Sequence, residues 1–249
     1  MNNNSDSQKN STNSIRKGIK DIWNAFMCED ADFSKKNDIP FCPTTATEIP
    51  TDIIPWDKAK AIYKSKIRSD KNFRYNAFVC FYLDDHKFDG KNGIWNNPQN
   101  ALKIIRHFEG VITPDFSTNQ DFPKPLKTYN TYRMRAFGFW LGKNGLKVIN
   151  NVRWGTKETY SYMFDGLPKN SILCIGTVGG SPRKHIDRKR FEKGLFELVK
   201  RYSPHTIIVY GSANYPCFQK LAEQGIKIKS YTSHTALAFE NLKAGDPHE

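Results

Sequence analysis

Residues 171–211 have the sequence SILCIGTVGGSPRKHIDRKRFEKGLFELVKRYSPHTIIVYG, in which two short apolar runs flank a long charged segment. The runs SILCIGT and HTIIVYG do not alternate between apolar and polar residues, which is typical of strands buried on both faces. The segment between them, from about residue 187 to residue 202, has the periodicity of an amphipathic helix. A strand, a helix and a strand in this order predict a right-handed crossover between two parallel strands.

The same alternation continues on both sides of this unit. Four further apolar runs predict strands at 76–83, 110–113, 146–152 and 226–232. Segments with helical spacing lie between the runs, at 98–108, 125–141, 160–164 and 217–223. Six strands are therefore predicted, and the proline-rich segment near 39–42 is a candidate for a seventh.

Parallel strands that alternate with helices define an α/β fold with two possible architectures. One is a TIM-barrel-like barrel, complete or incomplete, and the other is an open doubly wound sheet. No strand is followed by a G-x-G-x-x-G turn, so we favour the TIM-barrel-like barrel.

The N-terminal quarter of the chain has a different composition. Residues 1–14 are rich in Asn and Ser with almost no apolar content, and we expect them to form a disordered tail. Residues 15–75 contain two segments of helical spacing, 15–28 and 56–68, separated by prolines that discourage helix. We expect this helical, proline-rich extension to pack on one α/β domain at 76–240.

Composition narrows the class of protein. No apolar run approaches the ~20 residues that cross a bilayer, the N-terminus lacks the apolar stretch of a signal peptide, and the five cysteines include no C-x-x-C pair. We therefore expect a cytoplasmic protein without a membrane partner.

The net charge is +13, concentrated in the windows Lys58–Arg74 and Arg183–Arg201. Such an excess attracts polyanions, although a solvated surface produces the same count.

In both architectures ligands bind at the carboxyl ends of the strands. Asp84 and Asp85 follow the first of the six predicted strands, and Asp115 follows the next. Two carboxylates from neighbouring strands are candidates for an acid/base pair or for a Mg²⁺ site. Because Asp84 and Asp85 are adjacent, at most one of them is expected to face the centre. The structural alternative is that these aspartates cap loops or pair with lysines.

Other residues near the same ends are candidates for phosphate and base binding. Asn130 and Arg133 share a face of the helix at 125–141, where a guanidinium can bind a phosphate, whereas Arg135 is offset. Trp154 is placed to stack on a base. Gly179, Gly180 and Ser181 join a strand to a helix and can present backbone amides to a phosphate, although Walker spacing is absent. The structural alternatives are an Arg–Asp brace, a packed Trp and an ordinary turn.

Several uncommon strings occur in an order that resembles a known family. They are FYLDDHKFDGKNGIW (81–95), VITPDFSTNQDFP (111–123), YNTYRMRAFG (129–138), NVRWG (151–155) and IIVYG (207–211). From about Pro40 to Tyr231 the chain resembles domain of unknown function 4417, found in phages, plasmids and other mobile elements of Gram-positive bacteria.

This resemblance implies a mobile-element protein that acts near nucleic acid. It places the following residues at motif positions: Asp84, Asp85, Asp115, Ser117, Asn130, Arg133, Arg135, Trp154 and Gly211. Asn150 and Asn151 depart from the apolar-Pro pair that the resemblance leads us to expect.

Three classes of function fit these features. The first is an enzyme acting on nucleic acid or a nucleotide, with Asp84 or Asp85 and Asp115 as acid/base groups or Mg²⁺ ligands, Arg133 binding a phosphate and Trp154 stacking on a base. The second is a non-catalytic accessory protein, active in replication or against host defence, that binds DNA, RNA or a protein partner. The third is a small-molecule enzyme whose surface happens to be basic.

Overall fold

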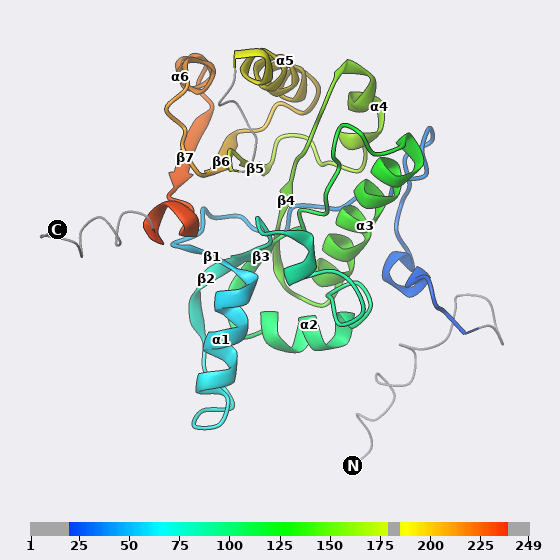
Figure 1. The fold of residues 1–249 in the computed structure, drawn as a ribbon, viewed down its shortest axis with the longest axis vertical. Helices are drawn as coiled ribbons and strands as arrows, with labels where there is room; N and C mark the ends of the chain where they lie inside the picture. The colour runs from blue at the N-terminus through cyan, green and yellow to red at the C-terminus, as the bar shows by residue number, and fades with distance from the viewer. Residues whose placement is uncertain (1–19, 179–184, 239–249) are drawn as a thin grey trace, which may run out of the picture.

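The computed structural model describes residues 20–178 and 185–238. It contains one sheet of seven strands, and each strand pairs in parallel with the next along the chain. The strands are β1 (Ile53–Pro55), β2 (Tyr75–Cys80), β3 (Phe108–Ile112), β4 (Lys147–Asn151), β5 (Ile172–Gly176), β6 (Thr206–Tyr210) and β7 (Lys227–Tyr231). The sheet curls into a half-barrel (Figure 1). The predicted TIM-barrel-like fold, in its incomplete form, is confirmed.

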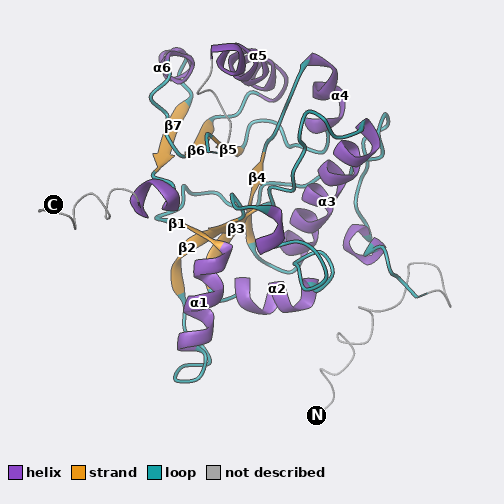
Figure 2. Ribbon diagram, in the orientation of Figure 1, coloured by secondary structure: helices purple, strands orange, loops and turns teal. Residues whose placement is uncertain are grey.

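Helices cover the outer face of the curled sheet (Figure 2). They are α1 (Trp56–Lys66), α2 (Pro98–Ile105), α3 (Lys124–Lys143), α4 (Tyr160–Met163), α5 (His185–Tyr202) and α6 (Pro216–Glu223). The first three pack on β2, β3 and β4 in one apolar cluster, and the last three pack on β5 and β6 in another. The six strands and five helices predicted from residue 76 onward are all present.

A third apolar cluster fills the concave face of the sheet. Alternate residues of the strands point into it, among them Phe78, Ile149 and Ile208. The rings of Tyr82 and Tyr210 stack at 4.9 Å and cover this cluster at the carboxyl ends of the strands. Burial on both faces explains why the strand sequences do not alternate between apolar and polar residues.

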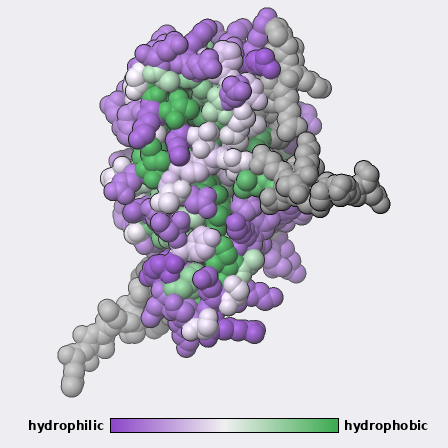
Figure 3. Space-filling model, turned by 90° about the vertical axis from the view of Figure 1, so that its left-hand side faces the viewer, coloured by the Kyte–Doolittle hydropathy of each residue, from purple (hydrophilic) through white to green (hydrophobic). Residues whose placement is uncertain are grey.

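The half-barrel is open between β1 and β7. Among the described residues no strand pairs with the free edge of either one, and the Tyr231 hydroxyl donates a hydrogen bond to the Pro50 carbonyl across this gap. Lys227 and Lys229 are exposed on β7, and lysines on an edge strand discourage pairing with another chain. Figure 3 faces this side of the molecule, where hydrophilic side chains surround separate small hydrophobic patches.

Two predictions for the N-terminal region were wrong. The strand is not near 39–42, where Pro40 forms only an isolated bridge with Phe33, but at Ile53–Pro55. A proline is tolerated there because β1 is an edge strand. In place of a helix over 15–28, the described part has a single 3-10 turn, Ala25–Cys28. The Asp21 carboxylate accepts the backbone N–H groups of Trp23 and Phe26, which is a local alternative to helical hydrogen bonding.

The segment that precedes β1 is inserted between two strands. The backbone N–H groups of Thr45 and Ala46 donate to the Val148 carbonyl of β4 at 3.0 and 3.2 Å. The Thr44 hydroxyl donates to the Ile172 carbonyl of β5 at 3.2 Å. Direct pairing between β4 and β5 involves only Asn150–Asn151 and Leu173–Cys174, so these contacts replace it at the amino ends of the two strands.

Within the described residues, no helix combines the length and the apolar character that crossing a membrane requires. The tail predicted at 1–14 lies outside the described residues.

Candidate functional site

A buried carboxylate lies at the rim formed by the carboxyl ends of the strands. Asp115 follows β3 and is 8% exposed. Its Oδ1 accepts a hydrogen bond from Asn151 Nδ2 and its Oδ2 accepts one from Arg153 Nη1, both at 2.8 Å. The Tyr82 hydroxyl donates to Asn151 Oδ1 at 2.9 Å. These four side chains form a continuous network across the ends of β2, β3 and β4.

Burial governs the charge state of this network. Desolvation raises the pKa of Asp115, while Arg153 and Asn151 oppose the rise and the negative charge of Asp85 adds to it. A buried carboxylate that loses its charged partner is strongly destabilising. Arg153, whose side chain is 29% exposed, is therefore both the stabilising partner of Asp115 and its link to solvent.

A second network ties the loops after β2 and β3 to α3. The two carboxylate oxygens of Asp85 accept the backbone N–H of Ser117 at 3.1 Å and its hydroxyl at 2.9 Å. The Ser117 carbonyl accepts a hydrogen bond from Asn130 Nδ2. Asn130 Oδ1 in turn accepts one from Arg133 Nη2 at 2.8 Å, and Arg133 Nη1 contacts Asp89 at 2.7 Å. Five polar side chains thus position the loop that carries Asp115.

Arg133 is a brace within this second network. Its guanidinium lies 3.9 Å from the centre of the Phe116 ring, and it is 8% exposed. Both terminal nitrogens are engaged with Asp89 and Asn130, so they are not directed at a ligand. The geometry corresponds to the structural alternative for this residue, with Asp89 as the partner.

The remaining predicted site residues lie in different surroundings. Asp84 is exposed, whereas Asp85 of the adjacent pair is bonded to Ser117 at the rim. Arg135 is fully buried and donates to the carbonyls of Asp165, Asn151 and Met163. Gly211 has φ +115° and borders a separate pocket of about 690 Å³ at the ends of β5, β6 and β7. Gly179, Gly180 and Ser181 lie outside the described residues.

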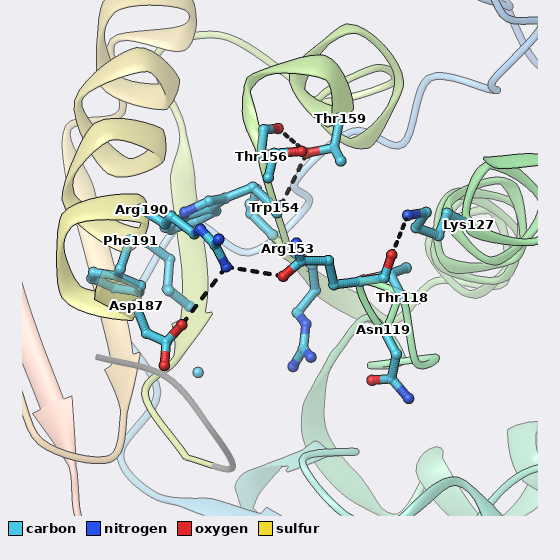
Figure 4. A pocket seen from close by; sticks show the side chains of 15 residues that line it. Thr118, Asn119, Lys127, Arg153, Trp154, Thr156, Thr159, Asp187, Arg190 and Phe191 are labelled. Carbon is cyan, nitrogen blue, oxygen red and sulfur yellow. Dashed lines mark hydrogen bonds and ion pairs between the residues drawn. The ribbon is translucent and has the colours of Figure 1, made fainter. Parts of the chain in front are cut away.

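A pocket of about 400 Å³ adjoins the Asp115 network (Figure 4). It is enclosed by the loops that follow β3 and β4, by the end of β5 and by the first turns of α5. We call it the Arg153 pocket, and its lining is Thr118, Asn119, Gln120, Lys127, Val152, Arg153, Trp154, Gly155, Thr156, Thr159, Ile175, Gly176, Asp187, Arg190 and Phe191.

One wall of the Arg153 pocket is aromatic. The rings of Trp154 and Phe191 lie 5.1 Å apart, and Trp154 also contacts Phe164. Trp154 packs so closely on α5 that a Cβ atom at Gly194 would lie 2.1 Å from its Cδ1. The position of this wall therefore depends on a glycine in the middle of α5.

Three cations also line the pocket. Lys127 of α3, Arg153 after β4 and Arg190 of α5 line it; Arg153 is paired with Asp115 and Arg190 with Asp187. Gln120 lies between two of them, since its carbonyl accepts a hydrogen bond from Lys127 at 3.0 Å and its Oε1 accepts one from Arg190 at 2.9 Å. Figure 4 shows Arg190 and Lys127 approaching from opposite sides of this loop. This charge balance suits an anionic ligand.

The surroundings of Asp115 do not fit a Mg²⁺ ion. Both of its oxygens accept hydrogen bonds from nitrogen donors, one of which is the guanidinium of Arg153. In the described part of the chain, no three His, Cys, Asp or Glu side chains are close enough together to hold a metal ion. Magnesium normally requires oxygen ligands that are free to coordinate it.

Lys127, Arg190 and Asp89 were missed by sequence reasoning, while Asn151 and Arg153 were placed at the rim without an assigned role. Asn151 and Arg153 were recognisable as polar residues at the end of a buried strand, which is the one local signal they carry. Lys127 and Arg190 are ordinary surface cations in the sequence, and Asp89 has no distinguishing neighbour. Only the fold brings them to the rim.

The fold and the site define an α/β half-barrel with a buried carboxylate network beside a cationic and aromatic pocket. The chain belongs to the family described as "Domain of unknown function (DUF4417)", which it matches over residues 31–232. The predicted resemblance to this family is thereby confirmed.

Two relatives are phage proteins, both named "Gene 1 protein". The one from Mycobacterium phage L5 is 30% identical over 166 residues, which cover 67% of this chain and 70% of the relative. The one from Mycobacterium phage D29 is 30% identical over 154 residues, or 62% of this chain, which spans 54% of that relative. No solved structure matches the chain.

Proposed function

We propose that the Arg153 pocket binds a nucleotide unit, either free or within a nucleic acid strand. Its phosphate contacts Lys127, Arg153 and Arg190, and its base packs against the wall formed by Trp154 and Phe191. The observation that carries the proposal is that three cations from three separate elements line one pocket that also has an aromatic wall.

The size and chemistry of the pocket support this ligand class. Its volume of about 400 Å³ falls in the range of ~300–1,000 Å³ typical of small-molecule sites. A guanidinium matches the oxygens of a phosphate, and an aromatic face stacks on any base. Among the hydrogen bonds of the described residues, Arg153 uses Nη1 on Asp115, and its side chain, 29% exposed, lines the pocket.

Asp115 is a positioning residue for Arg153 in this proposal. Its carboxylate holds the guanidinium at the floor of the pocket, and Asn151 and Tyr82 hold the carboxylate. A catalytic acid/base role for Asp115 is the second candidate. It is favoured by the raised pKa of a buried carboxyl group beside a pocket, since perturbed groups gather at functional sites.

Titration of the full chain with nucleoside monophosphates and with a short single-stranded oligonucleotide tests the proposal. Arg190→Ala removes one cation, and Arg106→Ala is the matched control. Arg106 is exposed and, like Arg190, bonds a side-chain amide oxygen, that of Asn144. A hydrogen bond to a charged group contributes about 1.5–3 kcal/mol, so R190A should weaken binding on the order of 10- to 100-fold.

The two variants separate the outcomes. Equal dissociation constants for R190A, R106A and the natural chain would contradict the proposal, as would binding of none of the ligands. Chromatography of each ligand after prolonged incubation distinguishes the second candidate, because only an enzyme converts the ligand. Unchanged ligand with retained binding supports the accessory, non-catalytic role.

A further inference from the structure

A concentrated basic surface lies on α1 and the turn that follows it. In the helix, Lys58, Lys60, Lys64 and Lys66 are exposed. Arg68, Lys71 and Arg74 continue the exposed charge beyond it. We call these seven side chains the α1 ridge; the acidic groups nearby in sequence are Asp57 and Asp70.

The cations of the α1 ridge lack acidic partners. Among the described residues, none of the seven forms an ion pair, whereas Arg133, Lys143, Lys147, Arg153, Arg190 and Arg201 all do. Lys60 lies over the Trp56 ring at 5.6 Å and contacts the Lys87 carbonyl. Like charges four residues apart, such as Lys60 and Lys64, destabilise a helix. The arrangement therefore costs stability that an acidic residue in the row would restore.

The cations of the ridge are closely spaced. Lys60 and Lys64 are four residues apart within α1, which places them on one side of the helix about 6 Å apart, and Arg68 follows in the turn after the helix. Buried Trp56 and Ala59 face the core. Closely spaced cations on one exposed surface suit a polyanion of high charge density, such as a duplex with one phosphate charge per ~1.7 Å of helix axis.

We propose that the α1 ridge binds the sugar-phosphate backbone of double-stranded nucleic acid without reading its sequence. Lysines predominate in the ridge, and lysine contacts phosphate as a point charge, whereas base recognition relies on bidentate donors. The lower end of the molecule in Figure 3, where α1 and the following turn lie, is predominantly hydrophilic.

This surface is separate from the Arg153 pocket. The ridge belongs to α1, which follows β1, and the pocket belongs to the loops after β3 and β4 and to α5. In Figure 1, α1 and α5 lie toward opposite ends of the vertical long axis. The inference therefore stands independently of the proposed nucleotide site.

The test is fluorescence anisotropy of the full chain with a labelled, mixed-sequence DNA duplex at several salt concentrations. Lys60→Gln with Lys64→Gln removes two cations of the row. Lys220→Gln with Lys227→Gln removes two exposed lysines from α6 and β7 and is the control with the same net charge. Circular dichroism verifies that both double variants are folded.

Each phosphate contact contributes about 0.9 to the slope of log K against log salt. Loss of Lys60 and Lys64 should therefore lower the slope by about 2 and weaken binding on the order of 10- to 100-fold at about 0.1 M salt. The control pair should bind as the natural chain does.

Three results would overturn the inference: equal losses in both double variants, no duplex binding by the natural chain, or binding to anionic vesicles in place of the duplex. R190A separates the two proposals, because it should leave duplex affinity unchanged. Duplex binding that depends on the ridge, without mononucleotide binding, refutes the pocket alone.

Discussion

The fully buried guanidinium of Arg135 is expected to be one of the strongest single contributions to stability in this fold. Arg135 lies on α3 with no exposed surface. Its three donors reach the carbonyls of Asp165, Asn151 and Met163 at 3.1, 3.0 and 3.2 Å. It therefore fastens the end of β4 and the region around α4 to α3.

Replacement of Arg135 by Met keeps the apolar stem and removes all three donors. The guanidinium stays charged at neutral pH, because burial lowers its pKa only to about 10. Three buried carbonyls lose a charged donor, and each buried acceptor that is left without a hydrogen-bond partner costs about 1–3 kcal/mol. Total stability is typically about 5–15 kcal/mol, so the loss is a large fraction of it.

Urea unfolding followed by tryptophan fluorescence measures the free energy of unfolding directly. Arg106→Met is the control, since Arg106 is exposed and a surface change there should cost about 0.5 kcal/mol or less. Arg135→Lys keeps the charge on a single nitrogen that cannot reach all three carbonyls, so its loss should be intermediate. R135K also gives a measurement if R135M does not fold.

A loss below about 1 kcal/mol for R135M, or one equal to that of R106M, would refute this reasoning. The first result would mean that the three carbonyls find other donors at little cost. The second would mean that Arg135 behaves as a surface residue.

Two further predictions concern the site itself. Gly194→Ala should destabilise the protein by about 1–3 kcal/mol, because the added methyl group would collide with the Trp154 ring. Alanine is normally a better helix former than glycine, so a higher melting temperature for this variant would contradict the close packing. The pKa of Asp115 is higher in the folded protein than in the unfolded chain. Its contribution to stability is therefore present below the pKa of the unfolded chain and is lost as pH rises through the pKa of the folded protein. The stability of the natural chain relative to Asp115→Asn should thus fall as pH rises from about 4, and an opposite slope in unfolding measurements would contradict the burial of this group.

The two networks at the rim assign a different task to each predicted residue. Asp85, Ser117, Asn130 and Arg133 hold the loop after β3 in place, and their polar groups are directed at one another. The cations that line the Arg153 pocket come from residues without unusual neighbours in the sequence. The polar residues of the motif therefore include residues that hold the loops of the site in place as well as residues that line the pocket.

The elements of the half-barrel could be predicted because each depends on its own residues. Strands β3 to β6 are short runs without apolar/polar alternation, and that pattern follows from burial on both faces wherever the strand lies, whereas the edge strand β7, KIKSY, is largely exposed. β1 was misplaced because it has only three residues, Ile53–Pro55, and ends in a proline. The turn at Ala25–Cys28 replaced a predicted helix because the Asp21 carboxylate bonds the backbone locally.

By itself, the sequence determined the order of strands and helices, the excess of positive charge and the polar residues at the carboxyl end of each strand. All of these are properties of neighbouring residues. Only the tertiary structure decided that Arg133 turns to Asp89, that Asp115 pairs with Arg153 and that Lys127 and Arg190 meet at one pocket. Such pairings depend on the curl of the sheet and on which side chains are buried next to one another. Both are determined by contacts between residues that are distant in the sequence.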